Sequence, residues 1–161
     1  MRLGILADTH DDLDRARYAV QLLHAEGAEA LIHCGDLASP PIVALLVGLP
    51  GWFALGNHDA DAVPDLERAA ADAGVTCLGW GGVVELNGKR IGVVHGHMTT
   101  DVRRVMAAGP DYLLSGHSHI ASSELVGGVR RINPGALYGA DEFTVALLDV
   151  ESGQIRFLRV P

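Results

Sequence analysis

Residues 3–10 read Leu-Gly-Ile-Leu-Ala-Asp-Thr-His, and this stretch decides the fold. Residues 2–7 form a short apolar run followed by turn-forming residues, which predicts a buried strand. A helical period over about 13–26 begins after the turn, with Asp11 or Asp12 as its N-cap. A buried strand that ends in a carboxylate and leads into a helix is typical of an α/β protein.

The same pattern, an apolar run that ends in an aspartate, asparagine or histidine, recurs along the chain. Six of the eight histidines lie in these motifs. Because strand ends in a parallel or mixed sheet meet at one rim, we expect the polar side chains to converge in space. The five motifs are Asp8-Thr9-His10, Gly35-Asp36, Gly56-Asn57-His58-Asp59, His95-Gly96-His97 and Gly116-His117-Ser118-His119.

Periodicity and turn signals predict the remaining elements. We expect helices at 13–26, 41–47, 64–73 and 100–107, and a β-α-β-α-β opening with right-handed crossovers. Asn87-Gly88 and Gly127-Gly128 indicate hairpin turns. The sum is a mixed sheet, or two sheets packed face to face with helices outside. The expected strands are 2–7, 30–34, 51–55, 75–78, 83–86, 90–94, 111–115, 122–126, 129–132, 143–150 and 155–160.

Size and composition indicate one domain, and we expect residues 1–161 to form it. No leader pattern opens the chain, and the apolar run around 41–50 is too short and too broken to cross a bilayer. We therefore expect a cytoplasmic protein without a membrane partner. The net charge of −8 argues against long nucleic acid as a partner. Cys34 and Cys77 lie in apolar segments, which favours buried free thiols.

The motif side chains form a set of metal-ligand types. Each motif alone fits an ordinary cap or turn, but five turns that all carry such residues favour one shared site. The set is too large for one tetrahedral ion and suits two ions that share a carboxylate. Imidazole and carboxylate without thiolate suit Mn²⁺, Fe or Zn²⁺ better than Mg²⁺ or Ca²⁺, and Mn²⁺ is the metal that we expect first. The expected ligands are Asp8, His10, Asp36, Asn57, His95, His117 and His119.

Charge counting predicts a phosphate ligand at this site. Two divalent ions against two carboxylates and one bridging hydroxide leave a positive centre, although the chain as a whole is acidic. Such a pair can hold a nucleophilic hydroxide and the phosphoryl oxygens during in-line displacement. The sequence therefore predicts a hydrolase of phosphate esters.

The order of these motifs resembles that of the calcineurin-like metallophosphoesterase superfamily. The short chain, His95-Gly96-His97 and Asn133-Pro134-Gly135-Ala136 make it similar to the small bacterial and archaeal phosphodiesterases of that superfamily. The resemblance extends from Asp8 to Gly135 and implies a four-layer α/β/β/α sandwich with two mixed sheets. The segment after Asp36 lacks the arginine of the protein serine/threonine phosphatases, which argues against that branch.

The resemblance also implies roles for the site residues. Asp36 would bridge the two ions, and His58 would protonate the leaving oxygen with Asp59 orienting its imidazole. His97 would touch the substrate phosphate, and His33 is interpreted as structural. One ion would be held by Asp8, His10, Asp36 and His119, and the other by Asp36, Asn57, His95 and His117.

The substrate is expected to be a small phosphodiester or nucleotide, because few basic residues flank the motifs to bind a doubly charged monoester. A phosphomonoesterase and a non-catalytic protein-docking scaffold of the same fold are the alternatives. Retention of His58 with the whole ligand set favours the enzyme, since a scaffold has no need of them. The sequence leaves open whether the chain forms an oligomer.

Overall fold

The structure is a computed structural model that describes residues 1–161. Each helix and strand lies within a few residues of a predicted one, apart from a short 3₁₀ helix. The helices are α1 (Leu13–Ala25), α2 (Pro40–Ala44), α3 (Val63–Ala73), α4 (Thr99–Ala107) and the 3₁₀ helix η1 (Asn57–Ala62). The strands are β1 (Arg2–Leu6), β2 (Ala30–His33), β3 (Gly51–Phe53), β4 (Thr76–Cys77), β5 (Gly82–Leu86), β6 (Lys89–Val93), β7 (Tyr112–Leu114), β8 (Ser122–Val126), β9 (Val129–Asn133), β10 (Phe143–Asp149) and β11 (Ile155–Val160).

The strands form two mixed sheets. The first has the order β11-β10-β1-β2-β3-β4, in which β1 to β4 are parallel and β10 runs antiparallel to β1 and β11. The second has the order β5-β6-β7-β9-β8, with β6, β7 and β9 parallel. Its two edge strands belong to the predicted hairpins, at whose turns Asn87 and Gly88 have φ of 49° and 72°.

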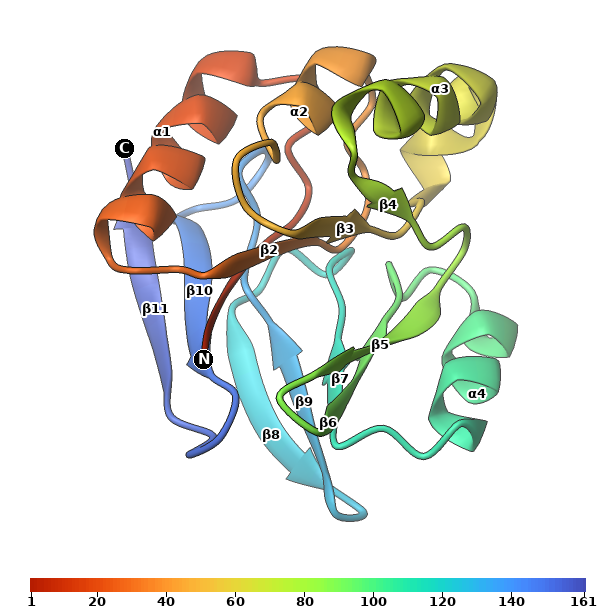
Figure 1. Cartoon of the computed structure of the whole chain (residues 1–161), viewed down its shortest axis with the longest axis vertical. Helices are drawn as coiled ribbons and strands as arrows, with labels where there is room; N and C mark the ends of the chain where they lie inside the picture. The colour runs from red at the N-terminus through yellow and green to blue at the C-terminus, as the bar shows by residue number, and fades with distance from the viewer.

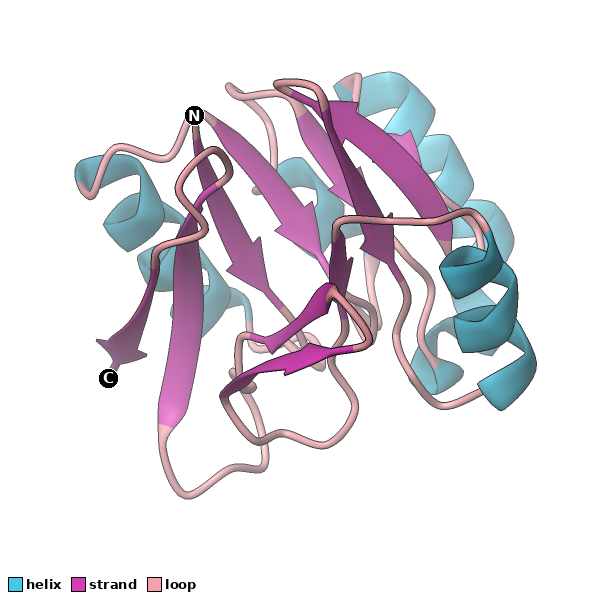
Figure 2. Cartoon of the chain, turned by 90° about the horizontal axis from the view of Figure 1, so that it is seen from below, coloured by secondary structure: helices cyan, strands magenta, loops and turns pink.

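Helices cover the outer faces of both sheets. In Figure 1, α1, α2 and α3 lie along the six-stranded sheet, and α4 lies beside β5 and β6 of the other sheet. Figure 2 shows the strands in the middle of the molecule and the helices at its periphery. This arrangement confirms the predicted α/β fold with two mixed sheets. The longest helix, α1 with 13 residues, falls short of what a bilayer crossing demands.

Three apolar cores separate the layers. Leu6 on β1 packs with Leu31, Phe53 and the α1–α3 side chains, whereas Ile5, its neighbour in sequence, packs between the two sheets. A smaller core around Val105 joins α4 to the second sheet. Because successive strand residues point to opposite faces, a strand buried on both sides must be apolar at nearly every position. That requirement accounts for the apolar runs in the sequence.

The motif residues lie in the segments that follow the carboxyl ends of five strands, four of them loops and the one after β3 leading into η1. Those after β1, β2 and β3 leave the first sheet, and those after β6 and β7 leave the second. Parallel pairing within each sheet places these ends on one edge, and the packing of the two sheets brings the edges together. The backbone topology therefore produces the convergence that the sequence predicted.

Candidate metal centre and active site

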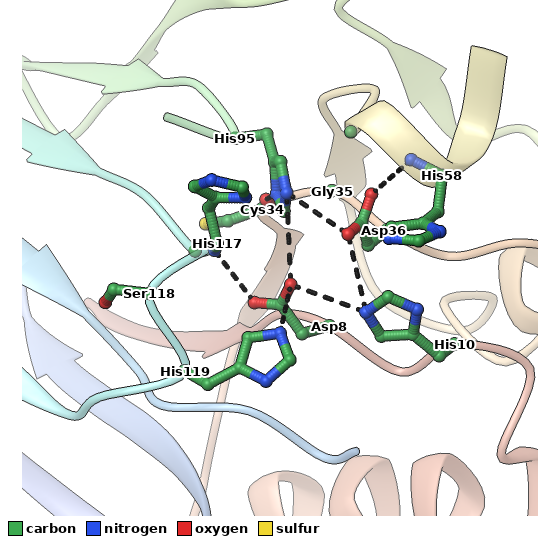
Figure 3. A network of polar contacts seen from close by, with 12 residues as sticks. Asp8, His10, Cys34, Gly35, Asp36, His58, His95, His117, Ser118 and His119 are labelled. Carbon is green, nitrogen blue, oxygen red and sulfur yellow. Dashed lines mark hydrogen bonds and ion pairs between the residues drawn. The ribbon is translucent and has the colours of Figure 1, made fainter. Parts of the chain in front are cut away.

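Two aspartates and four histidines form three overlapping groups at the rim. Within each group, one ligand atom from every residue lies within 4.8 Å of the others. Figure 3 shows Asp8 and Asp36 in the middle, with His10, His95 and His119 turned toward them. The groups are Asp8 with His10 and His119, His10 with Asp36 and His58, and Asp8 with Asp36 and His95.

Three buried polar atoms at this centre have no hydrogen-bond partner: Asp8 Oδ1, His10 Nε2 and His95 Nε2. Asp8 Oδ1 lies 3.2 Å from His119 Nε2, 3.8 Å from His10 Nε2 and 3.9 Å from His95 Nε2. Asp36 Oδ2 lies 3.4 Å from His10 Nε2 and 3.2 Å from His95 Nε2. Buried polar atoms normally have partners, so this cluster indicates that a ligand completes it.

The spacing of these atoms fits a metal ion. Donors that share an ion at about 2.1 Å are separated by about 3.0 Å in octahedral and about 3.4 Å in tetrahedral geometry. The separations of 3.2–3.9 Å between carboxylate oxygens and imidazole nitrogens lie close to these values. The donor set has the chemistry that Mn²⁺, Fe and Zn²⁺ accept.

Backbone carbonyls fix the tautomers of two histidines. His95 Nδ1 lies 2.8 Å from the carbonyl oxygen of Cys34, and His119 Nδ1 lies 3.1 Å from that of Gly139. A carbonyl only accepts, so each Nδ1 carries a proton, and each Nε2 is the ring nitrogen that faces the carboxylates and is left for a metal ion. Histidines that bind metals in proteins are held in this way.

Asp36 and His95 stabilise each other's charged forms in the absence of a cation. Burial alone would raise the pKa of Asp36, but the His95 imidazole and the His58 amide hold it at about 2. Burial alone would lower the pKa of His95, but Asp36, the Cys34 carbonyl and Asp8 together raise it. A cation at His95 Nε2 must displace a proton, so metal affinity should fall as the pH falls.

The outer oxygens of the two carboxylates bind loop amides. Asp8 Oδ2 accepts the His117 N–H at 3.0 Å, and Asp36 Oδ1 accepts the His58 N–H at 2.9 Å. These contacts need glycine nearby, since a Cβ on Gly56 would lie 2.1 Å from Asp36 Oδ1 and one on Gly116 2.7 Å from Asp8 Oδ2. The motifs therefore carry glycine at these positions because the carboxylates pass too close to the backbone for a Cβ atom.

The backbone of the site is unusual. Eight non-glycine residues of the chain have positive φ, and five of them are predicted ligands. Residues other than glycine rarely adopt positive φ. Such backbone strain is concentrated at functional sites, where the surrounding structure must enforce it. The five are Asp8, His10, Asp36, His117 and His119, with φ between 43° and 69°.

Three predicted residues lie around the compact groups. Asn57 and His117 are exposed and line the same cavity as His10 and Asp36. The His117 ring lies 5.1 Å from the His95 ring. His97 does not line this cavity; its ring lies 5.4 Å from that of His95 and 5.9 Å from that of Trp80. The His97 ring also lies 6.2 Å from the ring of His117, which does line the cavity.

His58 and Asp59 occupy different environments. His58 is exposed in the cavity, and its ring lies 4.8 Å from the His10 ring. Asp59 is fully buried, and its carboxylate accepts the backbone N–H groups of Asp36, Gly56 and Ala38 at 2.7–2.9 Å. Its hydrogen bonds go to the Asp36 loop and to Gly56, whereas the partner implied by the resemblance was the His58 imidazole.

A buried polar pair ties two ligand loops together. The Gly35 N–H donates to His33 Nδ1 at 3.2 Å, so His33 Nε2 carries the proton and faces the Thr9 hydroxyl at 3.1 Å. Thr9 in turn donates to the carbonyl of Asp36 at 3.3 Å. Thr9 lies between Asp8 and His10, so the network holds the loop after β1 against the loop after β2.

His33 should make the stability of the metal-free protein depend on pH. Burial lowers the pKa of His33 from 6.5 to about 3, against a smaller attraction from Asp8. Between these values the unfolded chain binds the additional proton, so the free energy of unfolding falls as the pH falls below 6.5. Its slope should approach about 1.4 kcal/mol per pH unit for this group.

Denaturant unfolding of chelator-treated wild type and His33→Asn between about pH 4.5 and 7.5 tests this prediction. Asparagine can still accept the Gly35 N–H but does not titrate. The difference in the free energy of unfolding between the two proteins removes the contribution of the other histidines, which both share. This difference should shrink toward low pH. Parallel curves would show that His33 is not the neutral buried base described here.

The cavity at the rim has a volume of about 610 Å³ and contains no lysine or arginine. Its lining adds two residues that the sequence analysis missed, Ala38 and Tyr138. Tyr138 follows the Asn133–Ala136 stretch, and its position just after a predicted motif was the only available signal. The lining residues are His10, Asp36, Ala38, Asn57, His58, His117, His119 and Tyr138.

The chain is similar to known proteins in both sequence and fold. The profile of the calcineurin-like phosphoesterase superfamily domain matches residues 1–153, and the chain belongs to this superfamily. A phosphodiesterase of Methanocaldococcus jannaschii is 29% identical over 168 residues, which cover 97% of each chain. A solved archaeal phosphodiesterase aligns with a TM-score of 0.87 at 28% identity over 99% of each chain. A solved phosphoesterase from E. coli, 19% identical with a TM-score of 0.71 over 100% of each chain, shares the fold.

These similarities confirm three predictions made from the motifs. The resemblance to calcineurin-like phosphoesterases was correct, and so was the fold class, two mixed sheets with helices on the outside. The predicted enzyme class was also correct: the chain is a phosphoesterase and therefore a hydrolase.

Proposed function

We propose that this protein is a phosphodiesterase that binds two divalent ions, Mn²⁺ first and Fe or Zn²⁺ as alternatives, and hydrolyses a small phosphodiester or nucleotide. The observation that carries the proposal is the orientation of His95 and His119. Each donates a hydrogen bond from Nδ1–H to a backbone carbonyl and turns Nε2 toward carboxylate oxygens, one of which is buried without a partner. This is the state that a metal-binding histidine needs.

The assignment of residues to ions follows the contacts. Asp36 Oδ2 lies between His10 and His95, which supports Asp36 as the bridge. His119 approaches Asp8 and places these two residues with His10 on one side. We therefore assign Asp8, His10, Asp36 and His119 to one ion, and Asp36, Asn57, His95 and His117 to the other.

The ions, when bound, would supply Lewis acidity toward phosphoryl oxygens and activate a water molecule. The chain's own residues do the rest. His58 lines the cavity beside the centre, where it can give a proton to the leaving oxygen. Asp59 binds three amides of the loops that carry Asp36 and His58, so we propose that it positions Asp36.

The cavity's charge favours a diester substrate. A diester carries one negative charge and a monoester two near neutral pH, and the cavity offers no lysine or arginine for the additional charge. Arg104 is committed elsewhere, to the Gly81 carbonyl and Asp101. Diesters should therefore be the better substrates.

Metal removal and reconstitution test this function. Chelator-treated protein should be inactive, and added Mn²⁺ should restore hydrolysis of bis-(p-nitrophenyl) phosphate with a larger kcat/KM than that of p-nitrophenyl phosphate. Mg²⁺ and Ca²⁺, which prefer oxygen ligands, should restore less activity. Faster monoester turnover would assign a phosphomonoesterase. No turnover of either ester by fully metal-loaded protein would remove the proposed activity.

A further inference from the structure

Tyr138 is an exposed aromatic residue at the rim of the cavity. About half of it, 51%, is exposed to solvent. Its ring lies 5.0 Å from the His10 ring, with 38° between the planes. A half-exposed tyrosine that lines a substrate-sized cavity can offer its ring to a ligand.

The backbone on both sides of Tyr138 is attached to the candidate metal centre. The Leu137 N–H donates to the Asp8 carbonyl at 3.2 Å, and the Gly139 carbonyl accepts the His119 Nδ1 proton at 3.1 Å. Arg15 also donates to the Leu137 carbonyl at 3.0 Å. The Tyr138 ring therefore has a defined position relative to two candidate ligands.

Tyr138 and His58 flank the same imidazole. The rings of both lie about equally far from the His10 ring, at 5.0 Å and 4.8 Å, and both line the cavity. A leaving oxygen that receives a proton from His58 has its substituent in this cavity. The two hydrophobic lining residues are Ala38 and Tyr138, and Tyr138 has the larger side chain. The substituent of the leaving oxygen would therefore lie in the same cavity as the Tyr138 ring.

We propose that Tyr138 is a specificity-determining residue that stacks on an aromatic group of the leaving alcohol, an aryl ring or a nucleobase. The inference rests on the phosphodiesterase function proposed above and names its substrate class. Stacking on an aromatic side chain contributes about tenfold or more in affinity. The protein should therefore prefer diesters whose leaving group carries an aromatic ring.

Two substrate pairs separate the aryl and nucleobase versions of this class. Methyl phenyl phosphate is compared with methyl hexafluoroisopropyl phosphate, whose leaving alcohol has similar acidity but no ring. Adenosine 5′-methylphosphate is compared with ribose 5-methylphosphate, with release of adenosine or ribose measured. Wild-type Mn²⁺ enzyme should favour the aromatic member of at least one pair by about tenfold in kcat/KM.

The variants isolate the aromatic face. Tyr138→Phe keeps the ring and should keep the preference, whereas Tyr138→Leu keeps apolar bulk beside His10 and should reduce the ratio to near one. Tyr18→Leu, on α1 with a comparable exposure of 48%, serves as the matched control. Mn²⁺ affinity, measured by calorimetry, should be equal in all four proteins.

Three outcomes would overturn the inference. An unchanged preference in Tyr138→Leu would show that Tyr138 does not contact the leaving group. An equal loss on both members of a pair, with weaker Mn²⁺ binding, would assign Tyr138 to the support of His10 alone. In both cases the wild type remains a phosphodiesterase. A wild type without any turnover would instead remove the proposed function, and this inference with it.

Discussion

Asparagine in place of Asp36 is expected to abolish turnover and to weaken the binding of both metal ions. Asp36 Oδ2 lies within 3.4 Å of His10 Nε2 and 3.2 Å of His95 Nε2, between the two halves of the candidate centre. The substitution removes one of only two carboxylates that the compact groups offer against two divalent cations. Changes beside a metal ligand already lower affinity or activity about 10- to 100-fold, so loss of the bridge should exceed about 100-fold.

Two further variants make this test specific. Asp14→Asn changes the charge equally on a side chain that is 98% exposed on α1, and it should behave as wild type. Asp8→Asn should lose one ion and keep the other, because Asp8 is assigned to a single ion. Calorimetric titration with Mn²⁺ gives the stoichiometry, and electron paramagnetic resonance separates a coupled pair from an isolated ion. If Asp36→Asn bound two ions with wild-type affinity, Asp36 would not be the bridge.

Asparagine retains the shape of Asp36 and can accept the His58 N–H, so the metal-free variant should stay folded. Its melting temperature should therefore be close to that of metal-free wild type. Added Mn²⁺ should raise the melting temperature of the wild type and leave that of Asp36→Asn almost unchanged, because binding stabilises only the protein that binds.

The strands and hairpins could be predicted because they depend on local sequence. Strands β8 and β11 have the predicted bounds, since glycine turns and alternating side chains define them. The placement of β10 beside β1 was beyond the sequence, because antiparallel pairing of residues 146–149 with residues 2–5 is decided by packing between distant segments. The 3₁₀ helix η1 was also missed, since its residues resemble an ordinary turn.

The convergence of the ligand types could be predicted from one rule, that parallel strands end at a common edge. What the rule does not give is the orientation of each side chain. The carbonyls of Cys34 and Gly139 that fix two imidazoles come from backbone geometry, and so does the positive φ at Asp8 and Asp36. Asp59 shows the consequence, because the family resemblance implied that it orients the His58 imidazole, whereas its carboxylate binds three amides.

Alanine in place of His58 is expected to lower kcat by about 10²- to 10⁴-fold for a diester with a poor leaving group, with metal binding retained. His58 is exposed in the cavity, and its backbone N–H donates to Asp36. The His58→Ala substitution keeps that amide, so the Asp36 loop should not move. Loss of the imidazole removes the proposed proton donor.

Leaving-group dependence separates this role from metal ligation, since His58 also forms one of the compact groups with His10 and Asp36. A proton donor matters most when the leaving alcohol is a weak acid, so aryl diesters with p-nitrophenolate should be affected far less than alkyl diesters. A lost ligand would instead slow every substrate and weaken Mn²⁺ binding. His24→Ala, an exposed histidine on α1, is the matched control. If the loss were equal for both leaving groups at full metal occupancy, His58 would not protonate the leaving oxygen.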